Sequence, residues 1–255
     1  MIINKVIMSS DDNPMYLDFW PIVSKIWKLK FNIEPILLYF GNNIDSIPCE
    51  YGTIIKMTTL NTLPISTQTQ CARIWYAGQC NDEIVMTSDI DMLPISINYF
   101  INSIENISND KYVHLNPINN NTYYPICYHI AKSNTFKNIL DLSDSFEQFI
   151  NDLILFSKGK EHLTSSFEGM IFKGHFWALD EIFISHKLND YKENNDNTII
   201  HLNRDTTKNN RIDRSYWKYD IDSLNDDLYF DCHSIRPYNS YKNIIDTLVE
   251  HIMKN

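Results

Sequence analysis

The tripeptide Asp-Ile-Asp occurs twice in the chain, as Asp89-Ile90-Asp91 and as Asp220-Ile221-Asp222. Two carboxylates, two residues apart in an extended segment, can present oxygens to one hard cation such as Mg²⁺ or Mn²⁺. Such a cation can in turn bridge to a diphosphate. The first copy, in EIVMTSDIDMLPI, directly follows a short apolar run at 84–87, whereas the second lies among other charged residues. We therefore expect metal chemistry at the first copy and a solvated loop at the second. The alternative for the first copy is a helix-capping pair before Pro94.

Short apolar runs in the first 95 residues predict the elements that position the first copy. The order of strand, helix, strand, strand, helix, strand is typical of an open α/β sheet. In such a sheet ligands bind at the carboxyl ends of the strands, so a motif directly after a strand faces the crevice. The first strand is expected to end in the polar loop SSDD. The predicted strands are 5–8, 36–40, 53–57 and 84–87, and the predicted helices begin at Pro21 and span 66–77.

The second half of the chain is less regular. The expected helices span 95–104, 145–156, 177–186 and 241–253, and the expected strands span 111–115 and 199–202. The polar tract KLNDYKENNDNT at 187–198 predicts a loop. On the helix at 177–186 we expect Ala178, Ile182 and Ser185 to share one side. On the last helix, the inward residues are expected to be Ile244, Ile245, Leu248 and Ile252.

Length and composition limit the classes of function. The chain has 255 residues, enough for a large core, and a formal charge of −10, which repels phosphate backbones and predicts no nucleic-acid binding. No apolar run approaches the roughly 20 residues of a membrane span. The five cysteines include no CxxC spacing, which favours a reducing compartment, and we expect a cytoplasmic protein. The composition indicates nothing about the oligomeric state.

The segment SDIDMLPI resembles the DxD segment of GT-A glycosyltransferases, which transfer a sugar from a nucleotide-sugar donor. FWALDE and DCHSIRP resemble acceptor-side and metal-side elements of the same superfamily. The pattern over 4–240 is similar to small glycosyltransferases of large DNA viruses and to bacterial surface-polysaccharide enzymes; a viral origin would imply the host cytoplasm. The resemblance implies a GT-A-like, Rossmann-like open mixed sheet flanked by helices in a single domain, 1–255. Residues 1–95 would form its nucleotide-sugar-binding half and 96–255 its acceptor-side half.

The resemblance also implies roles on the donor side. The donor would be a nucleoside-diphosphate sugar, with UDP expected, and the cofactor Mn²⁺ or Mg²⁺. Asp89, Asp91 and His233 would hold the metal, with Asp231 a weaker candidate. The alternatives are a polar turn for SSDD, a surface ion pair for Arg73 and a structural role for His233. The residues expected to bind the nucleotide sugar are Ser9, Ser10, Asp11, Arg73, Ser88, Asp89, Ile90 and Arg236.

On the acceptor side, Asp180 and Glu181 are the candidate catalytic residues and Trp177 is the expected platform for a sugar ring. The expected acceptor is a glycan hydroxyl. A carboxylate would deprotonate this hydroxyl in an inverting enzyme; in a retaining enzyme this region would position sugars. Neighbouring helical residues point about 100° apart, so the two acids are not expected to face the site equally. Asp180, three positions from Trp177, is favoured. The alternative is a pair of acids at a helix N-terminus, with Trp177 in the core.

Three other functions compete with sugar transfer. The first is a GT-A-like fold that has lost catalysis and only binds a sugar or a partner. The second is a phosphohydrolase with an aspartyl nucleophile, but such motifs generally follow an early strand, and here three strands precede the motif. The third is a nucleotidyltransferase, for which the 6 glycines of the chain leave little material for a glycine-rich phosphate loop.

Overall fold

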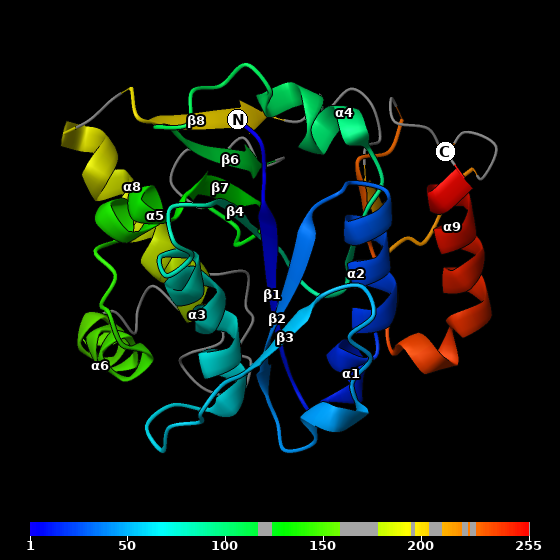
Figure 1. The fold of residues 1–255 in the computed structure, drawn as a ribbon, viewed down its shortest axis with the longest axis horizontal. Helices are drawn as coiled ribbons and strands as arrows, with labels where there is room; N and C mark the ends of the chain where they lie inside the picture. Colours follow the sequence, from blue (N-terminus) through cyan, green and yellow to red (C-terminus); the bar gives the residue numbers. More distant parts are fainter. Residues whose placement is uncertain are drawn as a thin grey trace.

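The computed structural model describes residues 1–116, 124–158, 178–194, 197–203, 211–220, 224 and 228–254. Within them the chain forms an open sheet in the order β3-β2-β1-β4-β7-β6-β8 (Figure 1). Strand β7 runs antiparallel to its two neighbours, and every other pair in this sheet is parallel. A second sheet has the order β5-β10-β9. The strands are β1 (Lys5–Asp11), β2 (Glu34–Phe40), β3 (Thr53–Lys56), β4 (Ile84–Thr87), β5 (Met92–Pro94), β6 (Tyr112–Asn116), β7 (His129–Lys132), β8 (Ile199–Asn203), β9 (Arg211–Asp213) and β10 (Asp231–His233).

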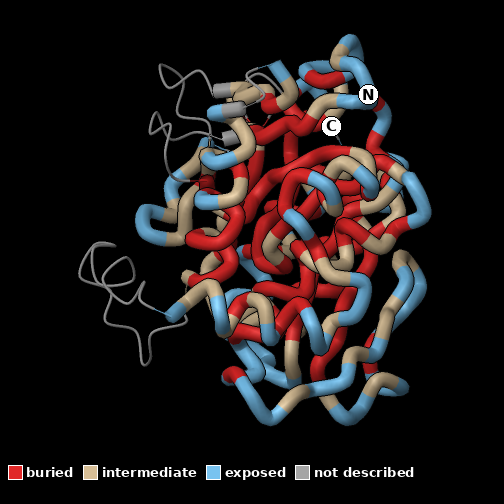
Figure 2. The backbone as a smooth tube through the Cα atoms, turned by 90° about the vertical axis from the view of Figure 1, so that its left-hand side faces the viewer, coloured by how far each residue is buried: buried red, intermediate tan, exposed pale blue. Residues whose placement is uncertain are grey.

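Helices cover both sides of the strands. In Figure 1, α2 and α9 lie on one side of β1, β2 and β3, and α3 lies on the other side with α5, α6 and α8. Figure 2 shows the buried residues running through the middle of the molecule. None of the described helices is long and apolar enough to cross a membrane. The helices are α1 (Pro14–Leu17), α2 (Trp20–Leu29), α3 (Ile65–Ala77), α4 (Ile97–Phe100), α5 (Ser133–Leu140), α6 (Phe146–Ser157), α8 (Leu179–Asn194) and α9 (Lys242–Lys254), with 3₁₀ turns at Ile44–Ser46, Asn102–Ile104 and Tyr238–Ser240.

The core explains why β1 is central. Its five interior residues are all buried, which is typical of a parallel strand covered on both faces. Helix α2 supplies the packing on one face through residues at helical spacing, among them the fully buried Trp20 and Trp27. Pro21 lies in the first turn of this helix, where its missing N–H costs nothing. The carboxyl ends of β1 and β4 therefore sit side by side on a rigid base.

The second sheet brings late residues of the chain to the motif at 89–91. Strand β5 begins directly after Asp91, and its first residue Met92 pairs with His233 of β10. On the other side of β10, His233 pairs with Asp213 of β9. The N–H of Ser234 donates to the carbonyl oxygen of Asp91 at 2.9 Å. This register alone places the ends of three short strands at one point.

The structure confirms the expected fold class, an open mixed α/β sheet flanked by helices. Strand β4 spans the predicted residues, and β2, β3, β6, β8, α2, α3, α6 and α9 lie within one or two residues of their predicted bounds. Strand β1 is longer than expected: it continues through Ser9 and Ser10 to Asp11, where a polar loop was predicted. The division into halves at residue 95 stays a prediction.

Three other expectations were wrong. The tract expected as a loop at 187–198 is helical as far as Asn194, because α8 continues to that residue with Leu188 buried and Tyr191 packed on the core. The helix expected at 95–104 is interrupted, and only 97–100 and a 3₁₀ turn at 102–104 are helical. On α9, Ile244 is 46% exposed rather than inward, whereas the other three named residues are buried and Val249 joins them.

A row of three histidines crosses the sheet. His114 of β6 lies between His129 of β7 and His201 of β8 in the strand register. The rings of His114 and His129 stack at 4.1 Å, and the Nε2 atoms of both lie within hydrogen-bond distance of the Pro125 carbonyl oxygen, at 3.2 and 2.8 Å. A neutral imidazole with its proton on Nε2 can donate to that oxygen, so neither ring needs a positive charge for this contact. Burial lowers the pKa of all three, that of His129 to about 3 and that of His201 to about 4.

The histidine row predicts loss of stability in mild acid. The folded protein holds His129 neutral while the unfolded chain takes up a proton near pH 6.5, so stability is present above that pH and falls as the pH decreases toward the folded-state value. This one residue should remove about 2 kcal/mol between pH 6.5 and 5. Urea unfolding of wild type and of His129→Gln measures the effect. An equal loss of stability in both proteins over this range would contradict the assignment.

Candidate active site

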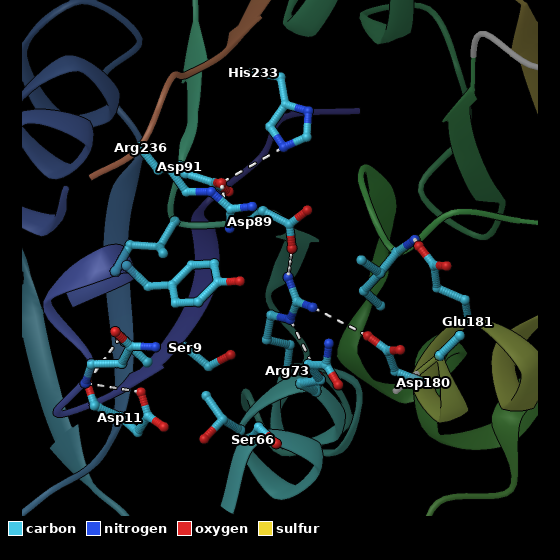
Figure 3. A pocket seen from close by; sticks show the side chains of 18 of the residues that line it. Ser9, Asp11, Ser66, Arg73, Asp89, Asp91, Asp180, Glu181, His233 and Arg236 are labelled. Carbon is cyan, nitrogen blue, oxygen red and sulfur yellow. Dashed lines mark hydrogen bonds and ion pairs between the residues drawn. The ribbon is translucent and has the colours of Figure 1, made fainter. Parts of the chain in front are cut away.

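A cavity of about 390 Å³ lies at the carboxyl ends of β1 and β4 (Figure 3). Its walls come from both the large and the small sheet, from α3 and from the start of α8. Five carboxylates, three arginines and one histidine line it, a density of charge that is unusual for a partly enclosed space. The lining residues are Ser9, Ser10, Asp11, Asn13, Tyr16, Ser66, Thr69, Gln70, Arg73, Asp89, Ile90, Asp91, Ile126, Ala178, Asp180, Glu181, Arg214, His233 and Arg236.

Helix α3 presents one face to this cavity. Ser66, Thr69, Gln70 and Arg73 follow the spacing i, i+3, i+4 and i+7, which puts them on one stripe of the helix. The residues between them, including Ala72, are buried against the sheet. Helix α3 therefore delivers a guanidinium group to the ends of β1 and β4 because its apolar residues anchor the opposite face.

The Arg73 guanidinium joins two carboxylates at the centre of the cavity (Figure 3). Its Nη1 contacts Asp89 Oδ1 and donates to the Ser88 carbonyl oxygen at 3.0 Å, and its Nη2 donates to Asp180 Oδ2 at 3.2 Å. The Nε donates to the Gln70 carbonyl oxygen at 3.2 Å. The Arg73 side chain is only 5% exposed. Burial would lower its pKa, but the two carboxylates outweigh burial and raise the pKa above the usual range.

Asp89 stays ionised in this arrangement. Burial opposes the charge on its carboxylate, yet Arg73 outweighs burial, and the pKa of Asp89 lies below its usual range. Its backbone N–H donates to the Cys127 sulfur at 3.1 Å. Asp89 is thus held from both its side chain and its backbone, and 36% of its side chain remains exposed toward the cavity.

Asp91 lies in a second cluster of charges, separate from Arg73. Its Oδ2 is 3.1 Å from Arg214 Nη1, 3.4 Å from Arg236 Nη1 and 3.6 Å from His233 Nε2. The other ring nitrogen of His233 lies 3.4 Å from Asp213 Oδ2. Burial opposes ionisation of Asp213, but hydrogen bonds from Ser215 outweigh it and hold the pKa of Asp213 low. The strand pairing of the small sheet places these residues side by side, because His233 pairs with Met92, which follows Asp91, and with Asp213, which precedes Arg214.

The donor types at Asp89, Asp91 and His233 fit Mn²⁺, since two carboxylates and a neutral imidazole suit that ion better than Mg²⁺. Asp91 Oδ2 and His233 Nε2 are 3.6 Å apart, close enough to share one cation. Within the described residues, however, no group of three or more such side chains is already arranged around one point. Arginines occupy the oxygens instead. The metal therefore stays a prediction.

Asp180 and Glu181 both line the cavity, although only one was expected to face it. Helix α8 begins at the cavity wall, so its first two acidic residues border the same space in different directions. Asp180 turns to Arg73, whereas Glu181 Oε1 accepts from the Ile126 N–H at 3.2 Å. Burial raises the pKa of Asp180 to about 6, against the opposing effect of Arg73, and raises that of Glu181 to about 7. Arg73 links Asp180 to Asp89, so the acids expected on the acceptor side lie next to the motif at 89–91; their roles stay a prediction.

The structure brings most of the predicted residues together. Ser9, Ser10, Asp11, Ile90, Arg236 and the residues of both charge clusters line one cavity, and Ser88 borders it through its carbonyl bond to Arg73. Trp177 and Asp222 lie outside the described residues, and Asp220 is exposed, as expected for a loop. Asp231 is not at the cavity: it is buried and bound by Arg211 through two bonds of 2.8 and 2.7 Å.

Sequence reasoning missed several lining residues. Asn13 and Tyr16 follow SSDD by only a few residues, and the loop position was the signal available for them. Arg214, in RIDRSYW, belongs to no motif, and only the pairing of β9 with β10 reveals its place.

No family model matches the chain, and no curated protein matches it in sequence. Its fold does match solved structures. The crystal structure of the glycosyltransferase GlyE from Streptococcus pneumoniae TIGR4 aligns with a TM-score of 0.52 and 9% sequence identity, over 99% of this chain and 60% of that one. An active-site mutant of LgtC aligns with a TM-score of 0.49 and 11% identity, over 91% of this chain and 88% of that one.

The likeness to GlyE shows that this chain has the fold of a GT-A type glycosyltransferase. The chain spans 60% of the length of that protein. The likeness to viral enzymes stays a prediction, and activity, donor and acceptor are matters for proposal.

We predict that Arg73→Ala is strongly destabilising. It leaves Asp180, which is 2% exposed, without its partner, and breaking a buried pair costs roughly 3–5 kcal/mol. The double variant Arg73→Ala, Asp180→Asn should recover part of the loss, because the unpaired charge is gone. Lys28→Ala, which breaks an ion pair at the surface, serves as the control and should cost at most about 1 kcal/mol. The test is a double-mutant cycle measured by urea unfolding. If the free-energy losses of the two single variants add up to that of the double variant, the coupling between Arg73 and Asp180 is contradicted.

We also predict that Glu181→Gln stabilises the protein at pH 8. The folded-state pKa of Glu181 is raised to about 7 from 4.5, so folding must bury a charge above pH 7, whereas glutamine keeps the oxygen that accepts from Ile126. The gain should reach about 3 kcal/mol at most, shrink as the pH falls through 7 and vanish near 4.5. Unfolding midpoints measured from pH 8 to 4.5 test this, with the exposed Glu250→Gln as control. A gain that did not depend on pH would rule out the raised pKa.

Proposed function

We propose that this chain is a metal-dependent glycosyltransferase that transfers a sugar from a nucleoside-diphosphate sugar to a hydroxyl group, with UDP-sugars as donors and a glycan as acceptor. The observation that carries this proposal is the cavity itself. Arginines, carboxylates and a histidine from distant parts of the chain gather at the carboxyl ends of β1 and β4. Ligands bind at this edge in open α/β sheets, and the fold likeness to GlyE is consistent with this class of reaction.

The nucleoside is proposed to lie near the end of β1. Ser9, Ser10 and Asp11 face the cavity there, beside the ring of Tyr16. The Oδ1 of Asp11 accepts from the Asn13 N–H at 3.1 Å, and the second oxygen can accept from a base edge. A planar ring and a carboxylate together suit a heterocycle with N–H donors.

The diphosphate is proposed to lie between the nucleoside and the motif at 89–91, within reach of Arg236. Asp89, Asp91 and His233 would hold the metal, which when bound would neutralise charge on the diphosphate. As the bond to the sugar breaks, negative charge grows on the leaving phosphate, and a guanidinium fixed at that place stabilises it. Asp180 keeps Arg73 in position for the same half of the site.

Glu181 is the proposed proton acceptor. A carboxyl with a pKa near 7 is well matched to take a proton from a hydroxyl at neutral pH, whereas Asp180 is engaged by Arg73. In an inverting reaction Glu181 deprotonates the acceptor hydroxyl as it attacks the sugar carbon. In a retaining reaction it orients the acceptor. This choice revises the preference for Asp180 that the spacing from Trp177 suggested.

The test measures release of nucleoside diphosphate and sugar transfer from a panel of nucleotide sugars with Mn²⁺. We predict that Asp91→Asn lowers the rate by about 10²–10³-fold while the protein stays folded, since the change keeps the shape and removes a charge from the donor site. The matched change Asp220→Asn, at the exposed copy of the tripeptide, should leave the rate unchanged. Equal loss in both variants would refute the assignment. Nucleotide binding without turnover would favour the alternative, a catalytically inactive binding protein.

A further inference from the structure

More positive charge meets Asp91 than one carboxylate can satisfy. The guanidinium groups of Arg214 and Arg236 both point at the same oxygen, Oδ2, from 3.1 and 3.4 Å. Each guanidinium carries five N–H donors, and an ideal carboxylate pair would use two of them on two oxygens. A single shared oxygen leaves most of these donors without a partner in Asp91. At this point of the cavity wall, two guanidinium groups therefore face one carboxylate oxygen.

The backbone of Arg214 is fixed although its side chain is accessible. It follows Asp213, the last residue of β9, which pairs with His233. The next turn is closed by three bonds to Asp213: Ser215 N–H donates to Oδ1 at 2.8 Å, and the N–H groups of Tyr216 and Trp217 donate to the carbonyl oxygen at 3.0 and 2.7 Å. The side chain of Arg214 is 34% exposed and lines the cavity.

Arg236 reaches the same point from another direction. Its guanidinium lies over the ring of Tyr16, 4.7 Å from the centroid, which orients the plane without consuming its hydrogen bonds. Its side chain is 20% exposed. Two planar cations thus approach one position from β9 and from the segment after β10.

The other arginines of the described cavity region are used differently. Arg73 is 5% exposed and bound to two carboxylates, and Arg211 makes a two-bond pair with the fully buried Asp231. In each of those pairs, the arginine already bonds to a buried carboxylate. The pairs at Asp91 share one oxygen and border the open cavity, which is the arrangement expected of groups that exchange partners.

We propose that Arg214 joins Arg236 in a two-guanidinium clamp for a diphosphate, and that Asp91 occupies this clamp in the ligand-free protein as an internal anion that the diphosphate displaces. The identity of the anion as part of a nucleotide rests on the proposed function. A diphosphate offers several oxygens in place of one and matches planar forks at two points. The exchange keeps both arginines paired throughout, so neither bears an unpaired charge in either state.

Displacement has a measurable consequence. Asp91 competes with the anion for the same donors, so it lowers the affinity for diphosphate in the absence of a divalent cation. Removing the negative charge of Asp91 should then strengthen the binding of diphosphate, although the same change is expected to lower the rate of sugar transfer. A residue that merely supports the fold would not produce this opposite pair of effects.

The experiment is calorimetry in a buffer with chelator, with inorganic pyrophosphate, UDP and uridine as ligands. Arg214→Ala should weaken pyrophosphate and UDP binding by about ten- to hundredfold, the scale of a lost charged hydrogen bond, and leave uridine binding unchanged. Arg214→Lys, which keeps the charge and loses the fork, should fall between. Lys218→Ala removes an exposed cation four residues further on and should bind as wild type. Circular dichroism establishes that each variant is folded.

Asp91→Asn provides the second arm and should bind pyrophosphate several-fold more tightly than wild type without metal. The clamp is wrong if wild type does not bind pyrophosphate, if Arg214→Ala binds it normally, or if Asp91→Asn weakens it. Binding of pyrophosphate with the expected pattern, but of no nucleoside diphosphate from a panel with four bases, would support the clamp and refute the proposed function.

Discussion

The site depends on one buried guanidinium. Arg73 links helix α3 to the end of β4 and to the start of α8, the two elements against which this helix also packs. Moving such a cation out of water is costly, and the cost is tolerable only when nearly every N–H finds an acceptor. Here two carboxylates and two carbonyl oxygens supply the acceptors. The geometry of the acidic groups around the cavity follows from that requirement.

The charges around the cavity consequently divide into two kinds. In the interior group, Arg73 and Asp180 are almost fully buried, and Arg73 bonds to both Asp89 and Asp180. The outer group around Asp91 is held by the small sheet, and in it two guanidinium groups share one carboxylate oxygen, which leaves N–H donors that Asp91 does not use. A binding site for an anion benefits from both groups. The interior group fixes the positions of the surrounding elements, and the outer group offers donors that can bond to the ligand. The two roles are divided among arginines that look alike in the sequence.

The sequence predicts the interior group better than the outer one. The motif at 89–91 could be placed because an apolar run of four residues precedes it and open sheets bind ligands at strand ends. Arg73 could be placed as well, because the sequence predicts the length of α3 and its end at Gly78. Arg214 could not be placed in this way, because β5, β9 and β10 have three residues each, too few to show a period. The pairing of β5 with β10 also joins residues as far apart in the sequence as Met92 and His233. Helix α8 was underestimated for a related reason: its polar second half is held by tertiary packing that composition does not show.

The segment at 124–128 lies between the cavity and the buried row of histidines. The Pro125 carbonyl oxygen lies against His114 and His129, the Ile126 N–H donates to Glu181, and the Cys127 sulfur accepts from the Asp89 N–H. One short segment therefore contacts neutral histidine rings on one side and the acidic residues of the cavity on the other. Burial acts on both sides, and it lowers the pKa of the histidines, which keeps them uncharged. On the cavity side the same burial raises the pKa of Glu181 only to about 7, which leaves that carboxyl able to gain or lose a proton at neutral pH.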